Sequence, residues 1–233
     1  MEKSQDIVEA SKAVREVART GGKTVDLVGD FGRFISQFVS GSLEQGTGIF
    51  EDKLRYMRWE RQVRYMERVH QRMNELGERS PTKPIPLKLA VPLFQAASLE
   101  DDDYLQDMWA NLLVNASVPK RGVELRRAYI DVLERLSPAE ALVLEKLCTI
   151  SEAERQGRPI VTGHLPEAVY IEYIDDEQER DKLVQPSKEI TMALANLSRL
   201  GCVKLQMTWA GGEVFTLVHP TVIGRGLIEA VQM

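Results

Sequence analysis

The sequence predicts a mainly α-helical protein, with an N-terminal helical bundle followed by a winged-helix-like α+β domain. Apolar residues recur at helical spacing in most segments before residue 137. After residue 137 the order becomes helix, helix, hairpin, helix, with "TWAGG" between two strand-like runs. A chain of 233 residues suits one large or two small domains. We expect three parts: N-terminal helices in 1–80, a central helical domain in 81–136 and the winged-helix-like domain in 137–233.

Two helices are predicted near the N-terminus, at residues 4–19 and 24–40. The second is apolar on nearly every side and contains Gly29 and Gly32. Glycines inside a helix are best explained by the close approach of another backbone. Three interpretations stay open for this helix: a core helix of the bundle, a subunit interface, or a membrane-active segment.

The stretch "GGKT" at 21–24 resembles the end of a phosphate-binding loop, which would imply a nucleotide. That loop needs a glycine five residues before Gly22, but Val17 stands there. The preceding residues also show helical rather than strand spacing. We therefore interpret Gly21 and Gly22 as the end of one helix and Thr24 as the start of the next.

A long helix is predicted at residues 50–77, with an apolar seam and a basic face. The seam alternates steps of three and four, as in a heptad repeat, and predicts an interface. It comprises Tyr56, Trp59, Val63, Met66, His70 and Met73. The basic face comprises Arg55, Arg58, Arg61, Arg64, Arg68 and Arg72. This face is either a solvated surface with local Glu–Arg pairs or a patch for an anionic membrane or nucleic acid.

The central part contains a proline-rich linker at 77–86, a short helix with Pro92, and predicted helices at 98–116 and 123–136. The acidic run at 100–103 is interpreted as the first turn of a helix, where the dipole favours anions. Ser98 is the predicted N-cap. A hard-cation site would instead need oxygens that converge from a loop.

The C-terminal part shows strong local signals. Ser137, Pro138 and Glu140 predict a capping box that starts a helix. Residues 168–174 form a candidate strand, 187–201 a helix ended by Gly201, and 202–218 a hairpin. Pro220 is the predicted first residue of the last helix. Acidic residues outnumber basic ones from residue 137 onward, so we favour a protein-interaction domain over a DNA reader.

Catalytic chemistry has little support in the sequence. His70, His164 and His219 are isolated, and no nucleophile elbow or paired metal-ligand motif occurs. Cys148 and Cys202 lie in apolar patterns typical of buried thiols in a reducing compartment. We expect no catalytic residue, no cofactor and no metal. No apolar signal segment starts the sequence, which favours the cytoplasm.

Three segments together resemble the abortive infection alpha family of bacterial proteins. They are "EDKLRYMRWERQVRYMERVHQRMNELG", "PIPLKLAVPLFQAASLEDDDYLQDMWANLLVNA" and "YIDVLERLSPAEALVLEKL". Within them, the family's signature is matched at residues 98–101, 109–113 and 136–138. The chain departs from the family at His219–Pro220, where a glycine-containing strand end is common. The resemblance implies a role in phage defence by halting the infected cell, and it supplies no catalytic residues.

These observations predict a non-enzymatic phage-defence protein that acts through protein contacts and self-association. We expect a homo-oligomer and a protein partner, with a membrane surface as a further candidate partner. The expected location is the cytoplasm, with contact to the inner membrane as an option. Nucleic acid is not an expected partner. The alternative function is a winged-helix transcriptional regulator of a defence or mobile-element locus, reading DNA through Lys188 and Arg199.

Overall fold

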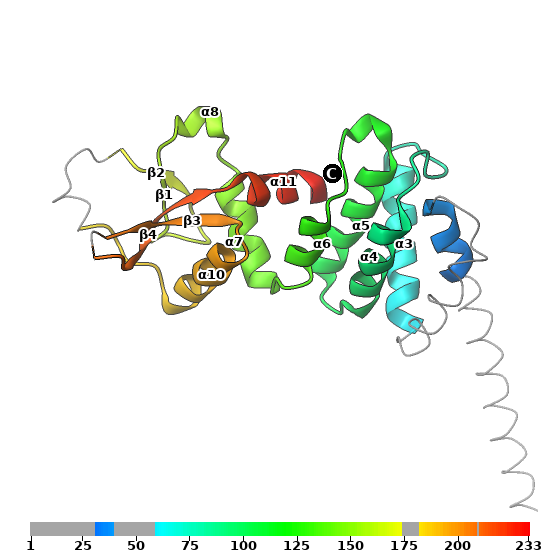
Figure 1. Ribbon diagram of the computed structural model, residues 1–233, viewed down its shortest axis with the longest axis horizontal. Helices are drawn as coiled ribbons and strands as arrows, with labels where there is room; N and C mark the ends of the chain where they lie inside the picture. The colour runs from blue at the N-terminus through cyan, green and yellow to red at the C-terminus, as the bar shows by residue number, and fades with distance from the viewer. Residues whose placement is uncertain (1–30, 40–58, 174–181, 209) are drawn as a thin grey trace, which may run out of the picture.

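The computed structural model describes residues 31–39, 59–173, 182–208 and 210–233. As predicted, the protein is mainly helical, and Figure 1 shows the helical part at one end and a small sheet at the other. A short helix spans 31–38. The other helices are α3 (Trp59–Glu75), α4 (Leu87–Leu99), α5 (Asp103–Ser117), α6 (Arg127–Leu133), α7 (Pro138–Cys148), α8 (Glu152–Arg155), α10 (Lys188–Arg199) and α11 (Val222–Val231), with a 3-10 turn η2 (Pro119–Arg121).

The sheet is antiparallel, with strand order β2-β1-β4-β3. Its strands are β1 (Ile160–Val161), β2 (Tyr170–Ile171), β3 (Val203–Met207) and β4 (Glu213–Pro220). The predicted hairpin is confirmed as β3 and β4, with Leu205 opposite Val218 and an irregular register between Leu205 and Gln206. The candidate strand at 168–174 contains the two-residue β2. The winged-helix assignment itself stays a prediction.

The helical part is organised around an aromatic cluster. Phe34 of helix 31–38 is buried, and its ring meets Tyr65 of α3 and Phe94 of α4 nearly edge-on, at centroid distances of 6.3 and 6.1 Å. The backbone N–H of Ile85 donates to the carbonyl of Phe38 at 2.7 Å, which ties the linker before α4 to this helix. The described half of the predicted 24–40 helix therefore buries its apolar face in the core of its own chain.

Gly32 does not have the close neighbour that the sequence suggested. Within the described residues, no atom lies within 4 Å of the place where a Cβ at Gly32 would sit. Among these residues the helix packs through its phenylalanines rather than through its glycine. Gly29 lies outside the described residues.

The junction between α4 and α5 differs from the prediction. Ser98 lies within α4, is fully buried, and its hydroxyl donates to the carbonyl of Phe94, so its assignment as an N-cap was wrong. The N-cap of α5 is Asp102, whose carboxylate accepts from Leu105 N at 3.0 Å. The N-cap therefore lies four residues later than predicted, because α4 continues through the buried Ser98.

Two of the three helix boundaries named for the C-terminal part were predicted accurately. The Ser137–Glu140 capping box is present, with Pro138 at the start of α7. The predicted helix end at Gly201 is also confirmed, since this residue has a left-handed φ of 75° after α10. Pro220 was placed wrongly: it ends strand β4, and Thr221 caps α11 by accepting from Gly224 N at 3.1 Å.

Helix α11 joins the sheet part to the helical part. It contacts α5, α6 and α7, and Figure 1 shows it between the two ends of the molecule. Close packing depends on Gly224, because a Cβ there would lie 2.2 Å from the carbonyl oxygen of Cys202.

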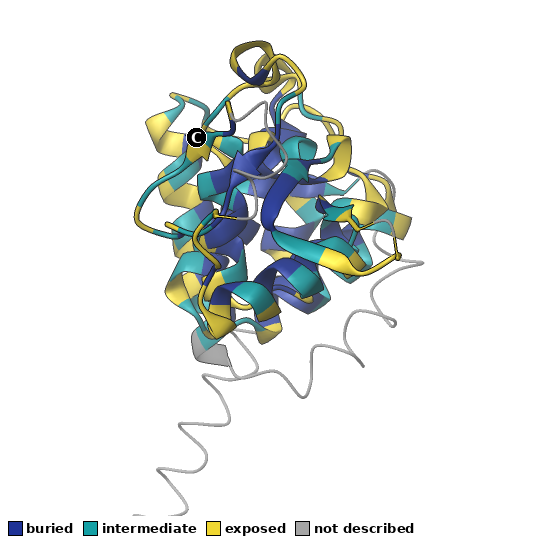
Figure 2. Cartoon of the chain, turned by 90° about the vertical axis from the view of Figure 1, so that its left-hand side faces the viewer, coloured by how far each residue is buried: buried dark blue, intermediate teal, exposed yellow. Residues whose placement is uncertain are grey.

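Buried apolar residues form one cluster from Phe31 to Val231. Figure 2 shows these buried segments on the inner faces of the helices and strands.

Candidate functional site

The predicted seam of α3 divides between the core and the surface. Met73 is buried in the core of the chain, whereas Val63 and Met66 are half-buried and line a pocket of about 380 Å³ with Phe34 and His70. The face of α3 that enters the core is offset from the seam and consists of Gln62, Tyr65, Val69 and Met73. Tyr56 and the side chain of Trp59 lie outside the described residues. The role of the seam as a subunit interface stays a prediction.

The described arginines of the basic face contact carboxylates of their own chain. Arg61 donates to Asp101 at 2.8 Å and to the carbonyl of Leu99. Arg68 donates to Asp107 at 2.6 Å and also to Asp103. The remaining pairs are Arg64 with Asp103 at 3.5 Å, and Arg72 with Glu75 at 3.0 Å and with Asp107 at 3.5 Å.

This α3–α5 charge network (Arg61, Arg64, Arg68, Arg72, Asp101, Asp103 and Asp107) gives the acidic run a second role besides capping. Its arginines lie 35 to 40 residues before their carboxylate partners, as in the pairs Arg68–Asp103 and Arg61–Asp101. The charge of Arg61, Arg64, Arg68 and Arg72 is therefore largely matched within the chain. Arg55 and Arg58 lie outside the described residues.

A second polar contact fixes the end of α11 to α5 and η2. The amide of Asn115 is buried and donates to the carbonyls of Ala230 and Gln232 at 2.9 and 2.8 Å. Its oxygen accepts from Arg121 at 2.9 Å, and Arg121 also donates to the Gln232 carbonyl at 2.9 Å. Asn111 adds a donation to the carbonyl of Val231 at 2.8 Å. We call this set of contacts the amide latch.

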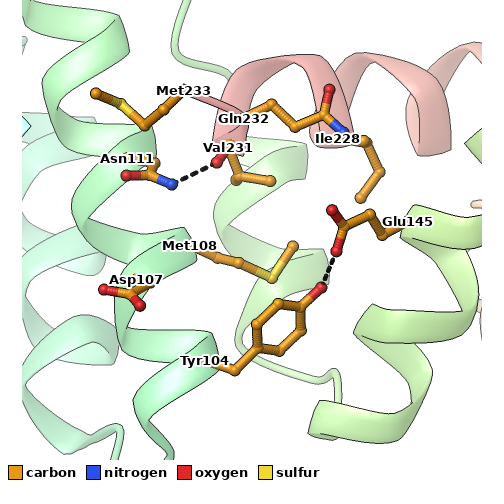
Figure 3. A pocket seen from close by; sticks show the side chains of 9 residues that line it. All are labelled: Tyr104, Asp107, Met108, Asn111, Glu145, Ile228, Val231, Gln232 and Met233. Carbon is orange, nitrogen blue, oxygen red and sulfur yellow. Dashed lines mark hydrogen bonds between the residues drawn. The ribbon is translucent and has the colours of Figure 1, made fainter. Parts of the chain in front are cut away.

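A pocket of about 380 Å³ opens beside the amide latch, where α5, α7 and α11 meet. Figure 3 shows side chains from all three helices around it. Helix α5 supplies Tyr104, Asp107, Met108 and Asn111; α7 supplies Glu145; α11 and the residues after it supply Ile228, Val231, Gln232 and Met233. The lining thus combines thioether and aliphatic side chains with two carboxylates, a phenol and two amides.

Tyr104 and Glu145 form the polar contact across this pocket, with the phenol donating to one carboxylate oxygen (Figure 3). Burial, followed by the bond to Glu145 and its charge, raises the pKa of Tyr104 far above its usual value of 10.0. The phenol therefore keeps its proton and acts as a fixed donor at neutral pH. Asp107, on the α5 side, already pairs with Arg68 and Arg72.

Sequence reasoning did not identify this pocket. Tyr104 and Glu145 are 41 residues apart, and Asn111 and Val231 are 120 apart. No spacing rule connects positions on three different helices.

Other titratable groups occupy packing positions. Burial raises the pKa of the Cys148 and Cys202 thiols to about 12, so both remain protonated and weakly nucleophilic. Burial, together with the charge of Arg155, lowers the pKa of His219, whose Nδ1 lies 3.5 Å from the Arg155 guanidinium. Arg155 itself is 2% exposed and donates to Glu152 and to the carbonyl of Arg158.

Within the described part of the chain, no three His, Cys, Asp or Glu side chains are grouped so as to hold a metal ion. None of the helices in the described ranges combines the length and the apolar character needed to cross a membrane.

The comparisons with known proteins give one match. The family model described as "Abortive infection alpha" matches residues 60–221, which is more than half of the chain. No curated protein and no solved structure matches the chain significantly. The match covers α3 from its second residue, the α3–α5 charge network, α7 and the whole sheet. The chain therefore belongs to the abortive infection alpha family.

Proposed function

We propose that the protein serves phage defence by contact with another protein, made through its C-terminal part and without catalysis. Family membership suggests abortive infection as the process. The observation that carries the contact mechanism is the distribution of exposed large apolar side chains. Among the described residues, only Leu87 and Leu99 of this group lie before residue 137. The others are Leu142, Tyr170, Tyr173, Val184, Met192, Met207, Val222, Ile223 and Met233.

Some of these side chains are so exposed that a domain without a partner would not need an apolar residue there. Met192 is 65% exposed on α10, and Val222 is 80% exposed in the first turn of α11. Exposed apolar side chains are ordinary when scattered, whereas a contiguous apolar patch is typical of a contact surface. We infer such a patch from the number of these side chains in the C-terminal part. In the helical part, by contrast, the exposed surface of α3 is charged and pairs with its own chain. The C-terminal part is therefore the better candidate for a partner.

The test is phage protection in cells that express surface variants. Met192→Lys places a charge on the proposed surface and should abolish protection while leaving the thermal unfolding midpoint unchanged. Leu99→Lys is the matched control, since Leu99 is 57% exposed on α4 in the helical part, and it should protect like the unaltered protein. Full protection by Met192→Lys, or equal loss in both variants, would contradict the proposal.

Self-association is part of the proposal, with Val63 and Met66 as the described seam residues at the surface. Light scattering of the purified chain measures the native mass. A Val63→Glu, Met66→Glu double variant should lower that mass to one chain. An unchanged mass, whether oligomer or monomer, would remove the seam from the proposal.

DNA reading has weaker support. Arg199 donates to Asn196 on its own helix at 2.6 Å, which leaves Lys188 as the exposed basic residue at the start of α10. A gel shift with DNA from upstream of the gene, lost in Lys188→Glu, would favour the regulator over the contact protein. Absence of binding at low salt would end that alternative.

A further inference from the structure

We propose that the pocket between α5, α7 and α11 binds a small organic cation, with its ammonium group on Glu145 and its apolar body against Met108 and Ile228. This goes beyond the proposed defence function and does not depend on it. The pocket volume of about 380 Å³ falls in the lower part of the range of small-molecule sites. The argument rests on charge, on lining chemistry and on position.

The charge argument centres on Glu145. This side chain is half-buried, accepts from the Tyr104 phenol, and forms no ion pair with any described residue. Asp107, the other carboxylate of the lining, is already paired with Arg68 at 2.6 Å. None of the residues that line the pocket is basic. A partly buried carboxylate without a counter-charge favours a ligand that carries one.

The hydrogen bond from Tyr104 leaves one oxygen of the Glu145 carboxylate to accept from a ligand. Tyr104 donates to Oε2 of Glu145, and the other carboxylate oxygen has no hydrogen-bond partner in the described chain. An ammonium or guanidinium group could donate to that oxygen without displacing Tyr104. An anionic ligand would instead be repelled by the charge of Glu145.

The remaining walls suit a hydrocarbon body. Met108, Ile228, Val231 and Met233 come from two helices and the residues after α11. Figure 3 shows Met108 between Tyr104 and Val231, and Ile228 next to Glu145. Methionine side chains adapt to different apolar shapes and make favourable contacts with aromatic rings. A compact arylalkyl amine combines the two required features, a cation at one end and a ring at the other.

The position gives such binding a consequence for the protein. The same pocket borders the Asn111–Val231 contact of the amide latch, at 2.8 Å. A ligand that touches both Glu145 of α7 and Ile228 of α11 would bind only when these helices hold their present spacing. Occupancy should therefore stabilise the joint between the helical part and the sheet part.

The experiment titrates the full chain with phenethylamine and with its uncharged analogue 2-phenylethanol, using calorimetry. The amine should bind saturably at one site per chain, at least about tenfold more tightly than the alcohol. Glu145→Gln keeps the shape and an acceptor for Tyr104 but removes the charge, and should weaken amine binding by about tenfold or more. Glu134→Gln, an exposed carboxylate of α6's end, is the matched control and should bind like the unaltered protein.

Methyl NMR of the methionines locates the binding and does not depend on any variant. The methyl signals of Met108 and Met233 should shift with the amine, while those of Met192 and Met207 on the C-terminal surface should not. Equal affinity for amine and alcohol, unchanged affinity in Glu145→Gln, or shifts at Met192 instead of Met108 would each overturn the proposal. None of these readouts involves phage protection, so failure here leaves the proposed function to its own test.

Discussion

The α3–α5 contact and the α5–α11 contact hold the same helix by different chemistry. On one side, α5 meets α3 through guanidinium–carboxylate pairs that are partly open to water; the side chain of Asp103 is 72% exposed and that of its partner Arg68 is 22% exposed. On the other side, α5 meets α11 through the buried amide of Asn115 and backbone carbonyls. Exposed ion pairs contribute little and are screened by salt, whereas buried hydrogen bonds are costly to leave unmade. Similar numbers of polar contacts should thus have unequal effects on stability.

The largest expected effect is at the amide latch. Asn115→Ala removes two donations to backbone carbonyls and the acceptor of Arg121, all at 2.8 to 2.9 Å. The stranded carbonyls and the small cavity should lower the free energy of unfolding by about 3 kcal/mol. Urea denaturation measures this. Asn74→Ala, at an exposed position of α3, should change it by less than about 0.5 kcal/mol. If Asn115→Ala lowers the free energy of unfolding by less than about 1 kcal/mol, the α5–α11 contact and the α3–α5 contact would be equivalent in stability.

The α3–α5 charge network should respond less, and in a salt-dependent way. Arg68→Gln removes the pairs with Asp103 and Asp107 and should cost about 1 kcal/mol in dilute buffer. In 1 M NaCl the Debye length falls to about 3 Å, so most of that difference should disappear. The isolated pair Arg127–Asp131 provides the control: Arg127→Gln should cost about 0.3–0.5 kcal/mol. If Arg68→Gln lowers the free energy of unfolding equally at high salt, packing of the aliphatic stem of Arg68 would be the dominant contribution.

The next prediction concerns the stability of the helical part and uses Gly32. An alanine there would have no described atom within 4 Å of its Cβ, and alanine is favoured over glycine within a helix, so Gly32→Ala should raise the free energy of unfolding by about 0.5–1 kcal/mol. Thermal unfolding of the chain, with light scattering in parallel, checks both stability and mass. Destabilisation with a change in native mass would instead place a second copy against Gly32.

The smallest expected effect is the pH dependence of stability that His219 gives to the sheet part. The folded-state pKa of His219 lies below its ordinary value near 6.5, first because of burial and then because of Arg155. The unfolded chain therefore takes up this proton before the folded chain does, and stability should fall as the pH drops from about 7 through the unfolded pKa toward the lower folded pKa. His219→Gln should flatten this part of the pH profile.

The sequence predicted the features that depend on short-range interactions and missed those that depend on tertiary contacts. The capping box at Ser137 and Glu140, the helix end at Gly201 and the β3–β4 hairpin depend on neighbours a few residues apart, and all were predicted. Ser98 and Asp102 were confused because both are good caps and only tertiary burial decides between them. The local signal at Pro220 was overridden because pairing with Val203 extends β4 through that residue.

The candidate site was beyond this kind of reasoning for the same reason. The sequence showed a basic face on α3 and an acidic run before α5, but no rule joined them across 35 or more residues. Glu145 looked like an ordinary polar residue of α7, because its lack of a counter-charge becomes visible only when α5 and α11 surround it. Family resemblance pointed to the process and left the surfaces and pockets to the structure.

The amide latch also has a consequence for synthesis on the ribosome. Asn115 finds its acceptors at residues 230 and 232, which are translated well over a hundred codons later. While the chain is emerging, α5 can collapse onto α3 and α4, but its buried amide must remain hydrated or find temporary partners. The central helices therefore reach their final packing only after the last helix has left the exit tunnel, so a nascent chain stalled before that point should be open to proteases that the finished protein resists.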